Sequence, residues 1–388
     1  MGQEIALLRN TGHTVIEYRR SNHEFDSLDL VSKARFPATA IWSLKTFREL
    51  VQVISRNKPD ITHFHNTFAM VSPSAYRACK SLGVPVVQTL HNYRLLCARA
   101  DLFHDNTVCE RCVGKFVPWP AILHRCYRDS FPLSAGVSSI LVFNRMIGTW
   151  EKYVDAFVAL TNFGKKKFVQ GGVPAKKIVV KPNFVYPDPG KKDGEGEFAL
   201  FAGRFSPGKG IKTMLSAWRS LPDVPLKLVG TGPESESISA FVKEWSLKGV
   251  QIIGDLPRNG LLGLMKHARM LVFPSEWYEG FPMVIAEAFA SGLPVVCSRI
   301  GAPAEVVQNT HTGLNFEPGT PPPTDLAEKV RWAWSHAKEM QEMGEEARHH
   351  YEKLYSADRN HALLMDIYRM VLDGAIRSQD VADPPTVS

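Results

Sequence analysis

The stretch Phe273-Pro-Ser-Glu-Trp-Tyr-Glu279-Gly-Phe-Pro282-Met-Val-Ile-Ala-Glu287 indicates a strand end, a loop and the start of a helix. Pro282 is expected to be the first helical residue, where its missing N–H costs no hydrogen bond. The free N–H groups and positive dipole end of such a helix can hold a phosphate or a sugar oxygen. Glu279 in the loop and Glu287 in the second helical turn bracket this point, although an isolated glutamate pair is more often ordinary surface charge.

Short apolar runs alternate with helical stretches in both directions from this segment, which is the pattern of parallel α/β layers. The runs predict strands at 13–18, 60–65, 84–90, 154–160 and 178–181 in the first half of the chain. In the second half they predict strands at 198–203, 226–230, 250–253, 270–274 and 294–298. Beyond Asp325 the apolar residues take helical spacing.

A chain of 388 residues with 44% hydrophobic and 22% charged residues suits two soluble α/β domains. Residues 186–197 are rich in Pro, Gly, Lys and Asp and are expected to link them. We therefore expect domains at 1–185 and 198–360, and a closing segment at 361–388 that ends in a frayed tail.

The charge is uneven, because residues 1–190 hold 25 Lys and Arg against 14 Asp and Glu. A basic first half suits an acidic acceptor or an anionic membrane surface, and it equally suits ordinary solvated charge. Asn144 and Arg145 interrupt the most apolar stretch, so no transmembrane helix is expected, and the first nine residues do not form a signal peptide. We expect a cytoplasmic protein, peripheral at the inner membrane face, with no nucleic-acid partner.

A second turn, Phe201-Ala-Gly203-Arg204-Phe-Ser-Pro-Gly-Lys209-Gly210, follows a predicted strand directly. Its Gly and Pro residues make it compact, so that Arg204 and Lys209 can point at one place. Two such cations can neutralise a departing diphosphate. Since the chain contains no Asp-x-Asp metal pair, we expect no catalytic metal. Taken alone, the two cations are more often a solvated turn.

Two weaker signals lie at other predicted strand ends. Gly230-x-Gly232 follows the strand at 226–230, and glycine there permits close approach of a ligand to the backbone. His91 lies just past the strand at 84–90, at the edge of a parallel sheet where ligands bind. A single histidine is more often structural than functional.

Together, Gly203-Arg204 with Lys209, Gly230-x-Gly232, Glu279-x7-Glu287 and His91 resemble glycosyltransferase family 4, the retaining GT-B enzymes. The resemblance implies two Rossmann-like domains, an N-terminal domain on the acceptor side and a C-terminal donor domain. It also implies that the last helix crosses back to pack on the N-terminal domain. It implies a UDP- or GDP-sugar donor and a saccharide or lipid-linked acceptor, as in polysaccharide or glycolipid assembly.

The resemblance also implies roles for individual residues. Arg204 and Lys209 would contact the donor diphosphate, Glu287 the ribose, and His91 the sugar from the acceptor side. Glu279 would contact the donor sugar together with the backbone of Gly280, Phe281, Met283 and Val284. Retention could proceed by front-face attack or through a covalent intermediate, and the sequence does not distinguish these routes.

The start of the chain departs from the family pattern. Residues 1–10 resemble a helix, so the first strand and Gly-Gly loop of family members are not found before it. This departure keeps a non-catalytic nucleotide-sugar-binding protein as an alternative. A nucleotide-sugar epimerase of similar architecture is the second alternative, although no acid/base pair for it can be assigned.

Four of the six cysteines fall within a single stretch: Cys97, Cys109, Cys112 and Cys126. A Cys-x-x-Cys pair with two further thiols suits tetrahedral zinc, and a cytoplasmic location disfavours disulfides. The stretch 94–128 has few apolar runs, so we expect a structural zinc ion to order it. Four unrelated thiols are the competing interpretation, and His104 and His124 are alternative ligands.

Overall fold

The computed structural model describes residues 1–21, 24, 39–318 and 323–374. The predicted frayed tail lies outside these residues. The chain divides into two compact units, the first made of Met1–Asp101, Glu110–Lys181 and His361–Ser388, the second of Leu102–Cys109 and Pro182–Asn360. The division after Lys181 comes slightly before residue 185, where the sequence analysis ended the first domain.

The first unit is built on a four-stranded parallel sheet with the order β1-β2-β5-β6. The strands are β1 (Thr62–His65), β2 (Val86–Leu90), β5 (Ala156–Ala159) and β6 (Ile178–Val180). Every residue of β2 and β5 is buried, as expected for the centre of a sheet covered on both faces. Four of the five strands predicted for the first half are therefore confirmed.

Helices pack around this sheet: α1 (Gly2–Asn10), α3 (Leu44–Asn57), α4 (Ser74–Ser81), α5 (Trp119–Leu123), α6 (Phe131–Met146), α7 (Thr149–Tyr153) and α8 (Asn162–Gln170). The Ser43 and Ser130 side chains cap α3 and α6 by accepting a backbone N–H of the first turn. In α16 (Ala357–Leu372), Ile367 and Val371 pack with buried residues of β2 and β5.

The prediction of a strand at 13–18 is wrong. These residues do not join the sheet, and β1 is its edge among the described residues. Ile16 is 43% exposed, so the apolar alternation that suggested a strand does not face a core. Tyr18 instead donates to Glu49 of α3, with 2.6 Å between the oxygens.

The second unit contains a six-stranded parallel sheet with the order β12-β11-β10-β7-β8-β9. Its strands are β7 (Phe198–Ala202), β8 (Leu226–Val229), β9 (Val250–Gly254), β10 (Ala268–Phe273), β11 (Val295–Ser298) and β12 (Gly313–Phe316). Chain order runs outward from β7 in one direction and from β10 in the other. The order reverses between these neighbours, which is the arrangement that binds nucleotides at the strand ends in doubly wound folds.

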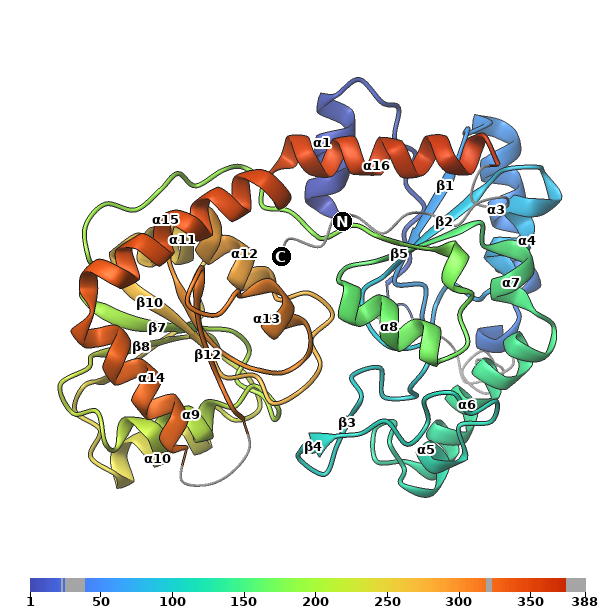
Figure 1. Cartoon of the computed structure of the whole chain (residues 1–388). Helices are drawn as coiled ribbons and strands as arrows, with labels where there is room; N and C mark the ends of the chain where they lie inside the picture. The colour runs from blue at the N-terminus through green and yellow to red at the C-terminus, as the bar shows by residue number, and fades with distance from the viewer. Residues whose placement is uncertain (22–23, 25–38, 319–322, 375–388) are drawn as a thin grey trace. The chain divides into compact units, whose positions relative to one another are not determined.

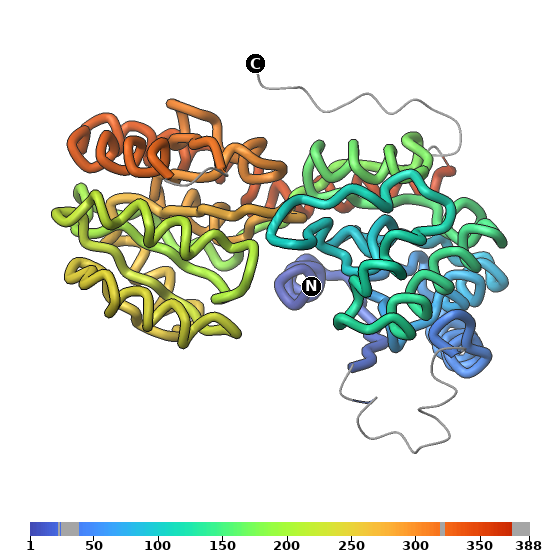
Figure 2. Tube along the Cα trace, turned by 90° about the horizontal axis from the view of Figure 1, so that it is seen from below, coloured from blue at the N-terminus to red at the C-terminus, as the bar shows by residue number. Residues whose placement is uncertain are grey.

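Helices lie on both sides of this sheet (Figures 1 and 2). They are α9 (Ile211–Trp218), α10 (Ser235–Glu244), α11 (Arg258–His267), α12 (Met283–Ala290), α13 (Gly301–Val306), α14 (Thr324–Ser335) and α15 (Ala337–Leu354). The helices α9, α10 and α14 bury one face of the sheet through apolar residues such as Met214, Ile238 and Val330. Strands therefore alternate their side chains between two buried faces.

Two pairing elements were not predicted. The strand β12 is short and begins at Gly313, where a Cβ would approach within 2.0 Å of the Val295 oxygen. An antiparallel hairpin, β3 (Phe103–His104) with β4 (Thr107–Val108), belongs to the second unit although its residues precede β5 in sequence. Runs of two to four residues carry too little periodicity to be found from sequence.

Candidate active site

A cavity of about 220 Å³ lies at the reversal between β7 and β10. The loops that follow the two strands line it, so it occupies the crevice at the carboxyl ends of the strands. Several residues predicted for the donor site line this cavity: Gly203, Lys209, Glu279, Phe281, Met283 and Val284. The fold thus brings together two motifs that are about seventy residues apart in sequence.

Glu279 is the best-connected side chain of the cavity. Its Oε1 accepts from Lys209 Nζ at 2.7 Å, from Trp277 Nε1 at 2.6 Å and from Ser275 Oγ at 3.0 Å. The side chains of Lys209 and Glu279 are only 19% and 13% exposed. Three donors on one oxygen fix the carboxylate and hold the ammonium group at the wall of the cavity.

Aromatic rings complete the environment of Lys209. Its ammonium group lies 5.8 Å from the centre of the Phe273 ring and 5.1 Å from that of Trp277. Phe103 of β3 packs edge-on against Trp277, with ring centres 5.9 Å apart. These ring contacts help to hold the ammonium group at the wall of the cavity.

The loop after β7 has its shape because two glycines let it approach the loop after β10. A Cβ on Gly210 would come within 1.8 Å of the Pro274 oxygen, and its φ of +67° is one that side chains disfavour. Glu276 N donates to Gly208 O at 2.8 Å, which joins the two loops directly. Lys209 lies between these glycines, so their packing sets its position.

The helix α12 begins at the cavity, although one residue later than predicted. Pro282 is the residue before the helix and Met283 is the first helical residue. No side chain in the described part of the chain caps this end, and the cavity is lined by Phe281, Pro282, Met283 and Val284. Backbone N–H groups at an uncapped helix start are available to hydrogen-bond an anionic ligand.

Glu287 lies on α12 but does not line the cavity. It is 9% exposed, and its Oε1 accepts from Arg258 Nε at 2.8 Å. Arg258 Nη1 donates to the backbone oxygen of Tyr186 at 2.7 Å. Its Nη2 is buried and has no hydrogen-bond partner among the described residues. Sequence reasoning missed Arg258, because nothing in residues 250–260 marks it as the partner of a glutamate 29 positions later.

The remaining residues of the donor motifs take other positions. Arg204 is exposed, and neither Arg204 nor Gly280 is among the described residues that line the cavity. A Cβ on Gly230 would lie 1.9 Å from the Gly203 oxygen, and one on Gly232 would lie 2.3 Å from the Phe205 oxygen. Both glycines are thus required for the loops after β7 and β8 to pack together, whether or not a ligand is bound.

In the first unit, His91 belongs to a chain of polar contacts at the ends of β1 and β2. His91 Nε2 lies 2.8 Å from His65 Nδ1, and His65 Nε2 lies 3.2 Å from Glu4 Oε1. Lys181 donates to Glu4 Oε2 at 3.0 Å, and its side chain is 2% exposed. His63, on the same strand face as His65, contacts Tyr368 and Thr89 at 2.8 Å each.

The environment of this network favours the neutral forms of His63 and His91. Burial, with the neighbouring His65 ring, lowers the pKa of His91 to about 4. Burial and His65 also lower the pKa of His63 well below its ordinary value. Burial acts to raise the pKa of Glu4, but hydrogen bonding to His65 and the charge of Lys181 outweigh it and lower that pKa. At neutral pH, His91 is therefore an uncharged imidazole.

The sequence carries a signal for part of this network. His63 and His65 alternate at the end of a predicted strand, which places them on one face, next to the strand that ends before His91. Glu4, Lys181 and Tyr368 could not have been found in the same way, since they come from segments remote in sequence.

The predicted zinc site is not supported by the geometry. Among the described residues, Glu4, His63 and His65 are the only group of three or more His, Cys, Asp and Glu whose ligand atoms lie within 4.8 Å of one another. Cys97, Cys109, Cys112 and Cys126 do not form such a group. Cys112 is instead buried with Ala98, Ala121 and Val137, so apolar packing helps to order this stretch, contrary to expectation.

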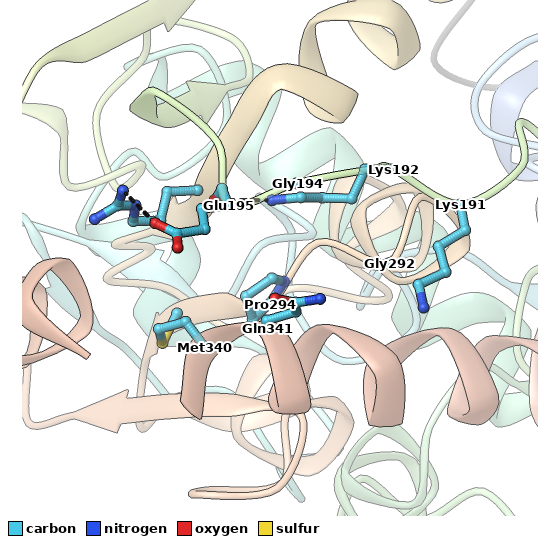
Figure 3. Close-up of a pocket in the computed structure, with 9 residues that line it drawn as sticks. Lys191, Lys192, Gly194, Glu195, Gly292, Pro294, Met340 and Gln341 are labelled. Atoms are coloured by element: carbon cyan, nitrogen blue, oxygen red, sulfur yellow. Dashed lines mark hydrogen bonds and ion pairs between the residues drawn. The ribbon is translucent and has the colours of Figure 1, made fainter. Parts of the chain in front are cut away.

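A second hollow lies beside residues 191–195 and holds only about 20 Å³, room for about one water molecule (Figure 3). Lys192 donates there to the Ala268 oxygen at 2.5 Å and to the Glu195 oxygen at 3.2 Å. Burial and the charge of Arg269 lower the pKa of Lys192 to about 8. These contacts tie the predicted linker to β10, and the hollow is too small for a substrate.

Comparison with known proteins identifies both units. The model of glycosyl transferases group 1 matches residues 185–350, and that of glycosyltransferase family 4 matches residues 7–188. An uncharacterized glycosyltransferase of Methanocaldococcus jannaschii, MJ1178, is 33% identical over 36% of this chain and 38% of its own length. The sulfoquinovosyl transferase SQD2 of Arabidopsis thaliana is 25% identical over 90% of this chain and 66% of its own.

Solved structures share the fold. Anabaena Alr3699/HepE in complex with UDP has a TM-score of 0.62 at 16% identity, and the match covers 82% of this chain and 80% of that one. In the part of the chain that the structure describes, no helix is both long enough and apolar enough to cross a membrane. Because the two family models together extend from residue 7 to residue 350, the chain belongs to the GT-B glycosyltransferases of the family 4 type.

Proposed function

We propose that this protein is a retaining glycosyltransferase that moves a sugar from a nucleoside-diphosphate sugar to a saccharide or lipid-linked acceptor. The observation that carries the proposal is the Lys209–Glu279 pair at the cavity between β7 and β10. A cation and a carboxylate held 2.7 Å apart can contact the diphosphate and the sugar of one donor. Membership of the family and the UDP bound to Anabaena HepE support a nucleotide donor.

The donor lies, in this proposal, with its diphosphate at Lys209 and at the uncapped start of α12. As the glycosidic bond breaks, negative charge develops on the departing phosphate, and the ammonium group and helix N–H groups stabilise that charge. Arg204 is exposed, and it reaches the diphosphate only if its side chain turns toward the cavity. Glu279 orients the sugar, Glu287 holds the ribose, and no catalytic metal takes part.

Glu287 adds a refinement to this assignment. In the structure it is paired with Arg258, whose Nη2 is buried with no hydrogen-bond partner among the described residues. A nucleotide that reaches Glu287 gives this N–H an acceptor, since a ribose or base oxygen can accept where the protein does not. We therefore include Arg258 in the nucleotide site. His91 acts on the acceptor side of the sugar, the role that the resemblance implies.

The alternatives predict different products. A non-catalytic binding protein leaves every donor intact, and an epimerase returns a nucleotide sugar with one inverted hydroxyl. The cavity contains one carboxylate among its lining residues, Glu279, and its oxygen is occupied by three donors. This arrangement favours stabilisation of charge over the proton exchange that an epimerase needs.

Proton NMR of a panel of UDP- and GDP-sugars, incubated with the protein in EDTA, separates these cases. The proposal predicts release of nucleoside diphosphate from at least one donor, with the anomeric configuration of the sugar retained. Inversion at the anomeric carbon would contradict a retaining mechanism. An epimerised donor, or a panel that stays intact with and without saccharide acceptors, would contradict the proposed activity.

A further inference from the structure

The first unit carries an exposed apolar surface around α5 and the first turn of α6. Large apolar residues there are exposed by 43% to 63%: Phe116 (55%), Val117 (43%), Trp119 (51%), Leu123 (63%), Phe131 (52%) and Leu133 (46%). Large apolar side chains exposed singly are normal on a protein, but a group of them within eighteen consecutive residues marks an interaction site. We call residues 115–133 the α5 surface.

Local structure explains why these side chains face outward. Trp119 and Leu123 are four residues apart on α5 and share one side of it. The opposite side buries Pro120 and Ala121, and Ala121 packs with Val137 of α6. Burial of the inner side thus fixes the orientation of α5 and leaves Trp119 and Leu123 in solvent.

Cations surround the apolar side chains. The α5 surface contains exposed Lys115, Arg125 and Arg128 against a single acidic residue, Asp129. Lys115 lies with its ammonium group 5.7 Å from the centre of the Trp119 ring. Aromatic and aliphatic side chains bordered by Lys and Arg are typical of surfaces that enter the boundary between lipid headgroups and acyl chains.

We propose that the α5 surface binds anionic lipid membranes, with Trp119, Leu123 and Phe131 entering the headgroup boundary and the cations on lipid phosphates. The positive charge of the α5 surface favours an anionic membrane over a neutral one, because each Lys or Arg close to anionic lipids strengthens binding about fivefold. A membrane-bound first unit would meet a lipid-linked acceptor where that acceptor resides. The proposal goes beyond sugar transfer and does not depend on it.

The histidine cluster of the first unit and the hollow beside Lys192 do not offer comparable binding sites. Glu4, His63 and His65 could hold a metal ion by distance, but Lys181 contacts the same carboxylate and each ring nitrogen of both histidines has a polar neighbour. A cation there would displace these contacts and meet the Lys181 charge at short range. The hollow beside Lys192 holds about one water molecule.

Sedimentation of the protein with vesicles tests the proposal, using phosphatidylcholine alone and phosphatidylcholine with phosphatidylglycerol, and no nucleotide sugar or acceptor. We expect binding to the anionic vesicles that weakens with added salt. Leu123→Glu should reduce binding at least tenfold, roughly the factor gained by burying one leucine side chain. Leu44→Glu is the matched control, since Leu44 is equally exposed at 63% but lies on α3.

Every other outcome overturns the proposal. Equal binding of both vesicle types would remove the role of the cations, and equal loss in both leucine variants would remove the role of the α5 surface. Sedimentation velocity without lipid, run on the wild type and on Leu123→Glu, tests whether the α5 surface instead forms a dimer interface. A dimer that Leu123→Glu dissociates, together with absent vesicle binding, would show that a second copy of the chain covers this surface.

Discussion

Replacing Lys209 by Met removes the charge at the cavity while keeping most of the length of the side chain. Breaking a buried ion pair by removing one partner costs about 3–5 kcal/mol when the remaining charge has no other contacts. Glu279 keeps two donors, Ser275 Oγ at 3.0 Å and Trp277 Nε1 at 2.6 Å. We therefore expect a smaller loss in the free energy of unfolding, about 1–3 kcal/mol.

The effect of the same substitution on the reaction should be larger. Losing one group that stabilises developing charge costs about 2.7–4 kcal/mol of transition-state stabilisation, which is a factor of about 10² to 10³ in kcat. A change of this size in kcat, with nucleoside diphosphate affinity reduced less, would place Lys209 at the departing phosphate.

A double-mutant cycle connects the two effects to the pair itself. Lys209→Met, Glu279→Gln and the double variant should show a coupling of about 0.5–3 kcal/mol in urea unfolding, because the two groups are in direct contact. Turnover of the double variant should be close to that of the slower single variant. Additive losses in both measurements would refute the claim that Lys209 and Glu279 act together.

Three further predictions follow from the geometry. Glu287→Ala should weaken binding of nucleoside diphosphate by about tenfold or more, which corresponds to the loss of one hydrogen bond to a charged group. Unchanged affinity of this variant in titration calorimetry would contradict the assignment of Glu287 to the ribose. In the folded protein the pKa values of His91 and His63 lie below 6.5, so both side chains stay neutral as the pH falls through 6.5. The same histidines take up protons in the unfolded chain over that range. The free energy of unfolding should therefore fall between about pH 6.5 and 5. Urea midpoints that stay level over that window would contradict this. Gly210→Ala should destabilise the second unit far more than Gly254→Ala, and thermal unfolding of the two variants measures the difference. Both glycines have positive φ, but only at Gly210 would the added Cβ clash, at 1.8 Å from the Pro274 backbone oxygen.

The central strands of both sheets could be predicted because each is a run of buried apolar residues between polar turns. The residues at 13–18 show where that reasoning fails, since no strand among the described residues pairs with them and Ile16 faces solvent. The strand β12 was missed for the opposite reason, because an edge strand that starts at Gly313 carries almost no pattern.

The candidate site divides along similar lines. Lys209 and Glu279 each follow a strand end, and strand order brings such ends together, so their meeting was foreseeable. Arg258 beside Glu287, and Glu4 beside His65, depend on packing between remote segments that no local pattern records. The predicted zinc site lacks geometric support for another reason: the cysteine spacing suggested metal ligation, but Cys112 lies in an apolar cluster.

Transfer of radiolabel from a nucleotide sugar to a saccharide or lipid acceptor, measured in EDTA, tests whether this protein is a metal-independent glycosyltransferase that depends on Glu279. Wild type and Glu276→Gln should transfer label at comparable rates, because Glu276 lies in the same loop but accepts from Thr213 and does not line the cavity. Glu279→Gln should transfer label at least about 10²-fold more slowly. Absence of transfer by the wild type from every UDP- and GDP-sugar offered, or equal rates for the two glutamine variants, would contradict the account.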